Sequence, residues 1–265
     1  MSKDESAPVL LDQEGAVAWL RLNRPAVLNA LDEATAHAFL DAVRTVADDS
    51  SVRVLVLSGN GRGFMAGGDL GRFQADLDHA ADTARAIIAP FHEALMRLHR
   101  LPIPVLASVH GPVAGAGMSL AMAADLCIAA DDARFTLAYA RIGASPDGSA
   151  SYFLPRLVGL RRAMEIAMLA DPIDAAEALR LGIVNRVVPA AALADETKAL
   201  AERLAAGPTA AYGRIKDLLH HSGTAELASQ LGAEEESFAA LAGTEDFREG
   251  IAAFFEKRKA RFHGR

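Results

Sequence analysis

Short apolar segments with the character of strands alternate with helical segments over the first part of the chain. This alternation restricts the fold more than any other feature. Residues 52–57 (VRVLVL) and 104–109 (PVLASV) are rich in apolar and β-branched residues, which is typical of buried strands. Between them, residues 83–100 place Ile87 and Phe91 on one face at helical spacing. The alternation predicts an α/β fold with right-handed crossovers.

The same pattern continues on both sides of these segments. Residues 16–20 form a predicted strand that ends at a turn over residues 23–25 (NRP). Asp32 is placed to cap a helix that runs to about residue 47. Residues 118–124 are predicted to be helical, and residues 126–129 are predicted to form another strand.

The character of the chain changes after about residue 186. Residues 190–206, 209–220 and 226–262 are predicted to be helical, with no strand pattern between them. We therefore divide the chain into an α/β core, residues 1–190, and a helical C-terminal region, residues 191–265. We expect the helical region to pack on the core or on a partner subunit.

Composition excludes several classes of protein. Hydrophobic residues make up 51% of the 265 residues and charged residues 23%, which excludes a disordered chain. The 27 Lys and Arg against 34 Asp and Glu give a net charge of −7, so nucleic acid is not expected as a partner. The single cysteine, Cys127, excludes an intrachain disulfide and suggests a reducing compartment.

Targeting and membrane segments are not expected. Residues 1–9 lack the apolar stretch of a secretory signal. Residues 113–130 are largely apolar, but Asp125, Gly115 and Gly117 interrupt them, which favours a buried helix followed by a buried strand over a membrane span. The prediction is a cytoplasmic protein.

Two glycine-rich turns share one layout, in which a strand leads through the turn into a helix. The turns cover residues 63–70 (GFMAGGDL) and 110–118 (HGPVAGAGM). Small residues let a ligand approach the backbone, and helix N-termini present free N–H groups. Facing each other, two such turns would form an oxyanion hole, worth about 2.7–4 kcal/mol per donor in a transition state. The alternative is that these glycines serve only close packing of helix on strand.

Several motifs in order along the chain resemble the crotonase (enoyl-CoA hydratase/isomerase) superfamily. The resemblance covers residues from about 9 to about 262. The motifs are residues 23–25 (NRP), 64–70 (FMAGGDL), 111–117 (GPVAGAG), 124–125 (AD), Phe135, 146–148 (PDG), 154–159 (LPRLVG), 176–189 and 254–258 (FFEKR).

The resemblance implies a spiral of ββα turns with C-terminal helices that build a homotrimer, often paired into a hexamer. It also implies an acyl-CoA thioester as substrate, whose enolate oxygen two backbone N–H groups stabilise. By position these donors are Ala66 and Ala116. The family usually has glycine at the second position, so Gly115 stays an alternative to Ala116.

The resemblance also bears on the reaction. Family members that hydrate a double bond use two glutamates, and this chain has Ser119 and Tyr139 at those positions. Asp147 matches instead the aspartate of enoyl-CoA isomerases, including the isomerase that opens the ring epoxide of phenylacetyl-CoA. One carboxylate suffices to move a proton between two carbons, so the expected reaction converts a 3-enoyl-CoA to a 2-enoyl-CoA. Residues 146–148 (PDG) are also a turn signature by themselves.

Further residues are expected to hold the substrate. Arg24 is a candidate for the CoA phosphates, and Lys257, followed by Arg258, resembles a basic pair that reaches CoA from a neighbouring subunit. Asp69 either caps the following helix or contacts substrate. The rest of the predicted substrate site is Ala66, Gly67, Gly68, Leu70 and Gly115. No metal is expected, and no cofactor beyond the CoA carried by the substrate.

Other functions remain open at this point. A hydratase with atypical acid and base residues and a non-catalytic acyl-CoA-binding protein both fit the same motifs. A nicotinamide enzyme is disfavoured because residues 115–120 (GAGMSL) lack the third glycine of the dinucleotide fingerprint. A serine hydrolase is disfavoured because Ser119 falls within a helix rather than at a sharp turn.

Overall fold

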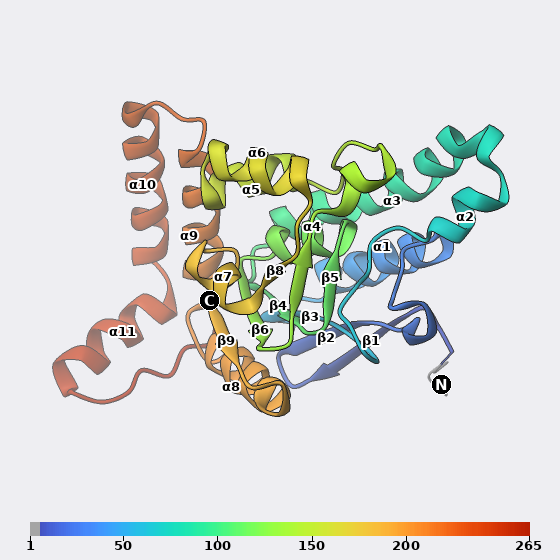
Figure 1. Ribbon diagram of the computed structural model, residues 1–265. Helices are drawn as coiled ribbons and strands as arrows, with labels where there is room; N and C mark the ends of the chain where they lie inside the picture. The colour runs from blue at the N-terminus through green and yellow to red at the C-terminus, as the bar shows by residue number, and fades with distance from the viewer. Residues whose placement is uncertain (1–5) are drawn as a thin grey trace.

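A six-stranded sheet forms the centre of the protein, and the computed structural model describes residues 6–265 (Figure 1). Its strands are β1 (Val9–Glu14), β2 (Val17–Leu22), β3 (Val54–Gly59), β4 (Val105–Val109), β6 (Leu126–Ala130) and β9 (Arg186–Val188), in the order β1-β2-β3-β4-β6-β9. Strand β1 pairs antiparallel with β2, and the other pairings are parallel. The predicted α/β alternation is confirmed, whereas β1 and β9 are strands that were not predicted.

A second, smaller sheet carries the glycine-rich turn before α4 and lies beside the first (Figure 1). Its strands are β5 (Pro112–Ala114), β7 (Arg134–Thr136) and β8 (Ile173–Asp174). None of them was predicted, because two or three residues are too few to show the alternation by which strands are recognised. A bridge between Met65 and Val113 ties this sheet to the turn after β3.

Eleven α-helices are found in the described residues. They are α1 (Glu33–Asp48), α2 (Leu70–Ala75), α3 (Ala80–Arg100), α4 (Ala116–Ala123), α5 (Ala150–Val158), α6 (Leu160–Leu169), α7 (Ala175–Arg180), α8 (Leu193–Ala205), α9 (Thr209–Ser222), α10 (Leu227–Ala242) and α11 (Glu245–Glu256). Four short 3₁₀ helices, η1 (Pro25–Val27), η2 (Leu77–His79), η3 (Ala138–Ile142) and η4 (Ala190–Ala192), lie in the connections.

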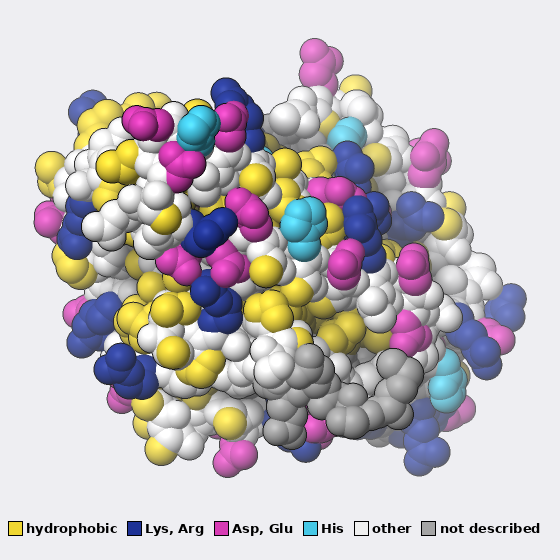
Figure 2. Space-filling model, turned by 90° about the vertical axis from the view of Figure 1, so that its right-hand side faces the viewer, with side chains coloured by type: hydrophobic (Ala, Val, Ile, Leu, Met, Phe, Trp, Pro, Cys, Tyr) yellow, Lys and Arg dark blue, Asp and Glu magenta, His cyan; other side chains and the backbone are white. Residues whose placement is uncertain are grey.

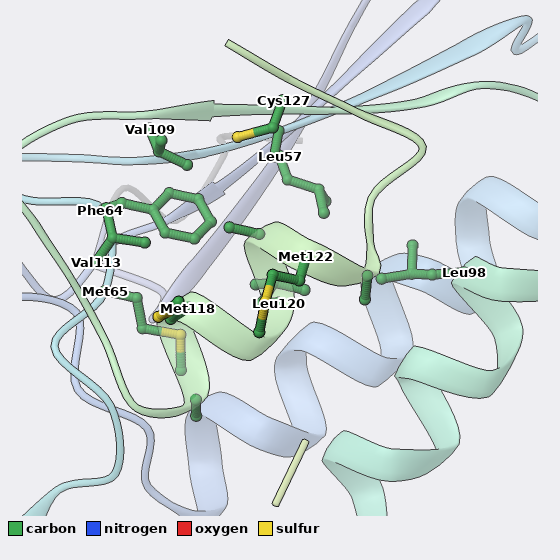
Figure 3. Packing of buried hydrophobic residues seen from close by; sticks show 14 of the residues in the cluster. Leu57, Phe64, Met65, Leu98, Val109, Val113, Met118, Leu120, Met122 and Cys127 are labelled. Atoms are coloured by element: carbon green, nitrogen blue, oxygen red, sulfur yellow. The ribbon is translucent and has the colours of Figure 1, made fainter. Parts of the chain in front are cut away.

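Helices α1, α3 and α4 enclose the larger hydrophobic core against one face of the sheet (Figure 3). Asp32 caps α1 as predicted, because its carboxylate accepts the Thr35 N–H at 2.8 Å. Phe64, fully buried, packs between Val109 and Val113 (Figure 3). Every residue of α4 is buried, so this helix is held on all sides.

Helix α8 covers the opposite face of the sheet. Its Leu193 and Ala201 are buried against Val54, Val56 and other residues of the central strands. The first helix of the predicted C-terminal region therefore forms a layer of the core.

Helices α10 and α11 extend away from the sheet on one side of the molecule, and α9 lies between them and the core (Figure 1). Lys216 of α9 donates to the carbonyl oxygen of Leu98 at 2.9 Å. The single helical segment predicted over residues 226–262 is wrong. Helix α10 ends at Gly243, and Thr244 caps α11 by accepting the Phe247 N–H at 3.1 Å. Helix α11 then ends at Lys257, which adopts the left-handed conformation. The hydrophobic period alone did not show this break, because a hydroxyl cap interrupts a helix without interrupting its apolar spacing.

The packing of α4 on the first glycine-rich turn predicts the effect of a small substitution. A methyl group on Gly117 would lie 2.2 Å from the carbonyl oxygen of Met65, a backbone atom that cannot move aside. We expect Gly117→Ala to destabilise the protein by about 1–3 kcal/mol, although alanine is the better helix former. Denaturant unfolding would measure the change.

The matched control is Gly232→Ala in α10, where an added methyl group meets no atom within 4 Å. There the helix propensity of alanine acts alone, and we expect unchanged or increased stability. Equal effects of the two substitutions would contradict the packing argument.

Candidate active site

The two glycine-rich turns lie in direct contact. Met65 bridges to Val113, and a methyl group on Gly115 would lie 3.4 Å from Cα of Gly67. Gly67 and Gly115 both adopt positive φ angles, 104° and 49°, which side chains disfavour. The two turns therefore meet backbone to backbone, as the oxyanion-hole interpretation requires and as the close-packing alternative also allows.

The amides of the first turn are not equivalent. The N–H of Ala66, predicted to be the first oxyanion donor, donates to the carbonyl oxygen of Leu28 at 3.0 Å. The N–H of Gly68 has no acceptor among residues 6–265. The N–H of Gly67 likewise has no acceptor among these residues, so Gly67 and Gly68, rather than Ala66, are the donors of this turn without a partner. The difference from the prediction arises because the partner of Ala66 lies far away in the sequence.

In the second turn, the amides of Gly115 and Ala116 differ in the same way. The Gly115 N–H donates to the carbonyl oxygen of Thr136 at 2.9 Å. Ala116 is the first residue of α4, where an N–H group has no acceptor within the helix. The Ala116 amide also lies at the positive end of this buried helix, which favours a negative charge beside it.

Asp147, Tyr139 and Ser119 form one hydrogen-bonded cluster beside the second turn. The Tyr139 hydroxyl donates to Oδ1 of the half-buried Asp147. The fully buried Ser119 hydroxyl lies 3.0 Å from the carbonyl oxygen of Asp147 and 3.2 Å from that of Gly115. A methyl group on Gly115 would lie 4.0 Å from the Tyr139 ring. Ser119 therefore links the backbone of Asp147, the predicted catalytic aspartate, to the turn that carries Ala116.

Tyr139 is held as a neutral hydrogen-bond donor. Burial, the charge of the Asp147 carboxylate and the hydrogen bond to it all raise the pKa of the Tyr139 phenol above its ordinary value. Its proton therefore stays in place at neutral pH and orients the carboxylate.

His92, on α3, is a part of this cluster that the sequence analysis missed. Its Nε2 accepts the N–H of Gly148 at 3.1 Å, directly after Asp147. Because Nε2 accepts, the ring proton is on Nδ1 in this state. A histidine on an exposed helix position carries no sequence signal, so only the tertiary contact identifies it.

The Arg24 guanidinium, predicted to bind the CoA phosphates, is already occupied by contacts within the chain. Its guanidinium lies 3.1 Å from both the Asp69 and the Asp32 carboxylates and also donates to the carbonyl oxygen of Ala30. Asp69 caps α2 by accepting the Gly71 N–H at 3.2 Å, which is the first of its two predicted roles.

The remaining predicted binding residues lie apart from one another. Leu70, half exposed, begins α2, while Lys257 ends α11. Helices α2 and α11 lie at opposite sides of the molecule, so Lys257 does not join this cluster within one chain (Figure 1).

Neither Ser119 nor Cys127 lies in an environment that would make it a nucleophile. Ser119 is fully buried with its hydroxyl between two carbonyl oxygens, an environment that does not make a nucleophile. Burial raises the pKa of the Cys127 thiol to about 12, which makes it an inert core residue. Among residues 6–265, no group of three His, Cys, Asp or Glu side chains is placed to hold a metal ion.

Charged side chains of both signs are spread over the surface that Figure 2 shows. On the face around α2, acidic and basic side chains are interspersed with apolar ones, without an extended basic area in the coloured part of Figure 2. None of the helices within residues 6–265 has the length and the apolar character that crossing a bilayer requires.

The profile of the enoyl-CoA hydratase/isomerase family matches residues 12–265. The chain belongs to this family. It is 40% identical to a probable enoyl-CoA hydratase of Rhodobacter capsulatus, over 94% of this chain and 95% of that protein. It is 37% identical to the 1,2-epoxyphenylacetyl-CoA isomerase of Escherichia coli, over 97% of this chain and 98% of that protein.

A solved structure agrees with this assignment. The crystal structure of an enoyl-CoA hydratase/isomerase homologue from Mycobacterium abscessus is 36% identical, with a TM-score of 0.92 over 97% of this chain and all of that chain. The predicted crotonase-type α/β fold is confirmed, and the protein is an enzyme of the enoyl-CoA hydratase/isomerase family. Relatives named as hydratases and as isomerases both resemble it, so membership alone leaves the reaction undecided.

The ionisation of Tyr139 predicts a pH effect on stability. An unfolded tyrosine has a pKa of about 10, and the folded pKa is raised above it. This contribution to stability is therefore complete below about pH 10 and is lost as the pH rises above it. The melting temperature of wild type should fall between about pH 9 and about pH 10.5, and that of Tyr139→Phe, which has no phenol to ionise at this position, should fall less over the same range.

Tyr152→Phe is the matched control, because Tyr152 lies on α5 nearby with its ring half exposed beneath Arg156. We expect its alkaline melting curve to follow wild type. Parallel alkaline losses in wild type and Tyr139→Phe would contradict the assignment.

Proposed function

We propose that this enzyme isomerises the double bond of an acyl-CoA thioester, converting a 3-enoyl-CoA to a 2-enoyl-CoA. The observation that supports the proposal is that the cluster beside the free amides contains one carboxylate, Asp147, with Ser119 and Tyr139 as its neighbours. Moving a proton between two carbons needs one group that alternates as base and acid, whereas hydration in this family uses two glutamates at the positions of Ser119 and Tyr139.

The free amides of Gly68 and Ala116 would receive the charge. In the proposed reaction, loss of a proton from C2 moves an electron pair onto the thioester oxygen and forms an enolate. Backbone donors in fixed turns stabilise that oxygen without reorganisation, at about 2.7–4 kcal/mol each. Gly67 and Gly115 bring the two turns into contact. The adjoining amides of Gly68 and Ala116 are therefore suited to act on one oxygen.

Asp147 would carry the proton. Its carboxylate takes the proton from C2, and the resulting acid returns it to C4, which leaves the double bond between C2 and C3. The hydrogen bond from Tyr139 orients the carboxylate, and the bond from the Gly148 N–H to His92 fixes the adjoining backbone. Opening of an aryl-epoxide acyl-CoA is a second candidate substrate reaction, favoured by the 37% identity to the Escherichia coli isomerase.

Replacement of Asp147 tests the proposal. We expect Asp147→Asn to lower kcat for a 3-enoyl-CoA by at least about 100-fold, because an amide cannot act as the base. The measurement is turnover of a panel of 3-enoyl-, 2-enoyl- and aryl-epoxide CoA esters by wild type and variant.

The control is Asp76→Asn, at a half-exposed carboxylate that caps η2 outside the cluster. It should leave turnover unchanged. Full activity of Asp147→Asn would contradict the proposal. Hydration of the 2-enoyl-CoA as the main wild-type activity would favour the hydratase alternative, and binding without turnover would favour a non-catalytic acyl-CoA-binding protein.

We further propose that the enzyme is a cytoplasmic homotrimer or hexamer. Two separate apolar surfaces are exposed on one chain, which suits a ring in which one surface of each copy meets the other surface of the next. The first lies on α10 and α11 and includes Phe238, Phe254 and Phe255, and the second lies on α6 and includes Leu160 and Met168. In such a ring, Lys257 would approach the CoA of a neighbouring copy.

Light scattering on the purified protein tests this assembly. Phe254 and Phe255 are 76% and 77% exposed, and their joint replacement by aspartate would place two charges in the interface. We expect wild type to have the mass of a trimer or hexamer and the double variant a smaller mass. Leu77→Asp, at a residue 71% exposed in η2, is the control and should not change the mass. A monomeric wild type would contradict the proposal.

A further inference from the structure

Arg24 joins the N-terminal ends of two helices. Its guanidinium lies 3.1 Å from a carboxylate oxygen of Asp69, which caps α2, and 3.1 Å from one of Asp32, which caps α1. It also donates to the carbonyl oxygen of Ala30. The Arg24 side chain is 25% exposed and the two carboxylates 18% and 20%, so the contacts are partly shielded from water.

The segment that begins with Arg24 is bonded to the first glycine-rich turn on both sides of Gly68. Leu28 accepts the Ala66 N–H at 3.0 Å. Leu31 donates to the carbonyl oxygen of Gly67 and accepts the Asp69 N–H, both at 2.8 Å. The Gly67 carbonyl and the Gly68 N–H belong to one peptide group, so residues 28–31 hold this peptide group, the next one, which carries the Asp69 N–H, and the one that carries the Ala66 N–H.

Asn29 secures the same segment from inside. This residue is 1% exposed, and its side-chain amide lies 2.9–3.1 Å from the carbonyl oxygens of Asn60, Gly63 and Phe64. Its Oδ1 accepts the N–H of Arg24 at 2.8 Å. The backbone of Arg24 is thus fixed to the beginning of the turn, while its guanidinium is fixed to the end of the turn at Asp69.

We propose that Arg24 is a positioning residue that sets the direction of the Gly68 N–H toward the thioester oxygen. Asp69 follows Gly68 directly, so a guanidinium that holds the Asp69 side chain limits rotation of the peptide group between Gly68 and Asp69, which adjoins the peptide group that carries the Gly68 N–H. This inference rests on the proposed function of Gly68 as an oxyanion donor.

The same contacts oppose direct phosphate binding by Arg24. One positive charge lies between two carboxylates, so the local net charge is negative and repels a phosphate. The two roles predict different kinetics: a phosphate-binding residue acts mainly on KM, whereas a residue that aligns an oxyanion donor acts mainly on kcat.

Arg24→Gln is the principal variant. We expect kcat for 3-enoyl-CoA isomerisation to fall about 10–100-fold with KM changed less than about threefold, because misalignment weakens a donor without removing it. Arg24→Lys keeps the charge and should recover part of the loss. A rise of KM with unchanged kcat, or unchanged kinetics, would overturn the inference.

Arg21→Gln is the matched control. Arg21 lies three residues earlier on β2 and is ion-paired with Asp12, away from the turn. Its replacement should leave kcat and KM within about twofold of wild type. Equal losses in both variants would indicate a general effect of removing an ion pair and would overturn the inference.

Two further measurements keep the test decisive. Asp69→Asn retains an oxygen that can cap α2 but removes the charge that Arg24 holds, so it serves if Arg24→Gln does not fold. The double variant Arg24→Gln/Asp69→Asn should lose no more activity than the more affected single variant, since both remove one contact. Additive losses would overturn the inference.

Infrared spectroscopy separates failure of this inference from failure of the proposed function. The probe is butyryl-CoA with a ¹³C-labelled thioester carbonyl, which binds without isomerising. We expect its carbonyl stretch to shift to lower frequency on wild type and to shift less on Arg24→Gln at equal occupancy. An equal shift on both proteins would overturn the role of Arg24, even if wild type proved to have no isomerase activity.

Discussion

Backbone-to-backbone contact between the two glycine-rich turns is the constraint on which the rest of the site depends. At Gly67 and Gly115 the chain adopts positive φ angles and comes within van der Waals distance of itself, and at Gly117 a single methyl group would strike Met65. Side chains would hold the turns apart at these points. Because they are absent, two amides from segments about fifty residues apart in the sequence lie in one small region, beside a helix N-terminus that favours negative charge.

The polar groups around this contact are arranged to hold positions. Tyr139 keeps its proton and orients the Asp147 carboxylate, Ser119 lies between two carbonyl oxygens, and Gly148 is bonded to His92. On the opposite turn, Arg24 and Asn29 occupy the donors and acceptors that would otherwise leave the loop free. The Gly68 amide thus differs from its neighbours Ala66 and Asp69 in having no acceptor among the described residues, whereas the Asp147 carboxylate is held by the Tyr139 hydroxyl.

Local patterns predicted much of the fold correctly. The buried strands after residues 52 and 104, the Asp32 cap and the helix over α3 follow from apolar period and capping chemistry, which act between near neighbours. The errors share a cause. The strands of the small sheet are too short to show a period, and the break at Gly243 and Thr244 depends on one hydroxyl that leaves the apolar spacing intact.

The sequence by itself determined that the chain alternates strands and helices, that two glycine-rich turns precede helices, and that Asp147 is the carboxylate in the family's motif. Only the tertiary structure decided that the Ala66 and Gly115 amides are occupied, that Gly68 has no acceptor within residues 6–265, and that Arg24 lies between two carboxylates. The physical reason is that a hydrogen bond joins groups by position in space. The partners of Ala66, Gly115 and Arg24 lie about six to about forty-five residues away, beyond the reach of any local pattern.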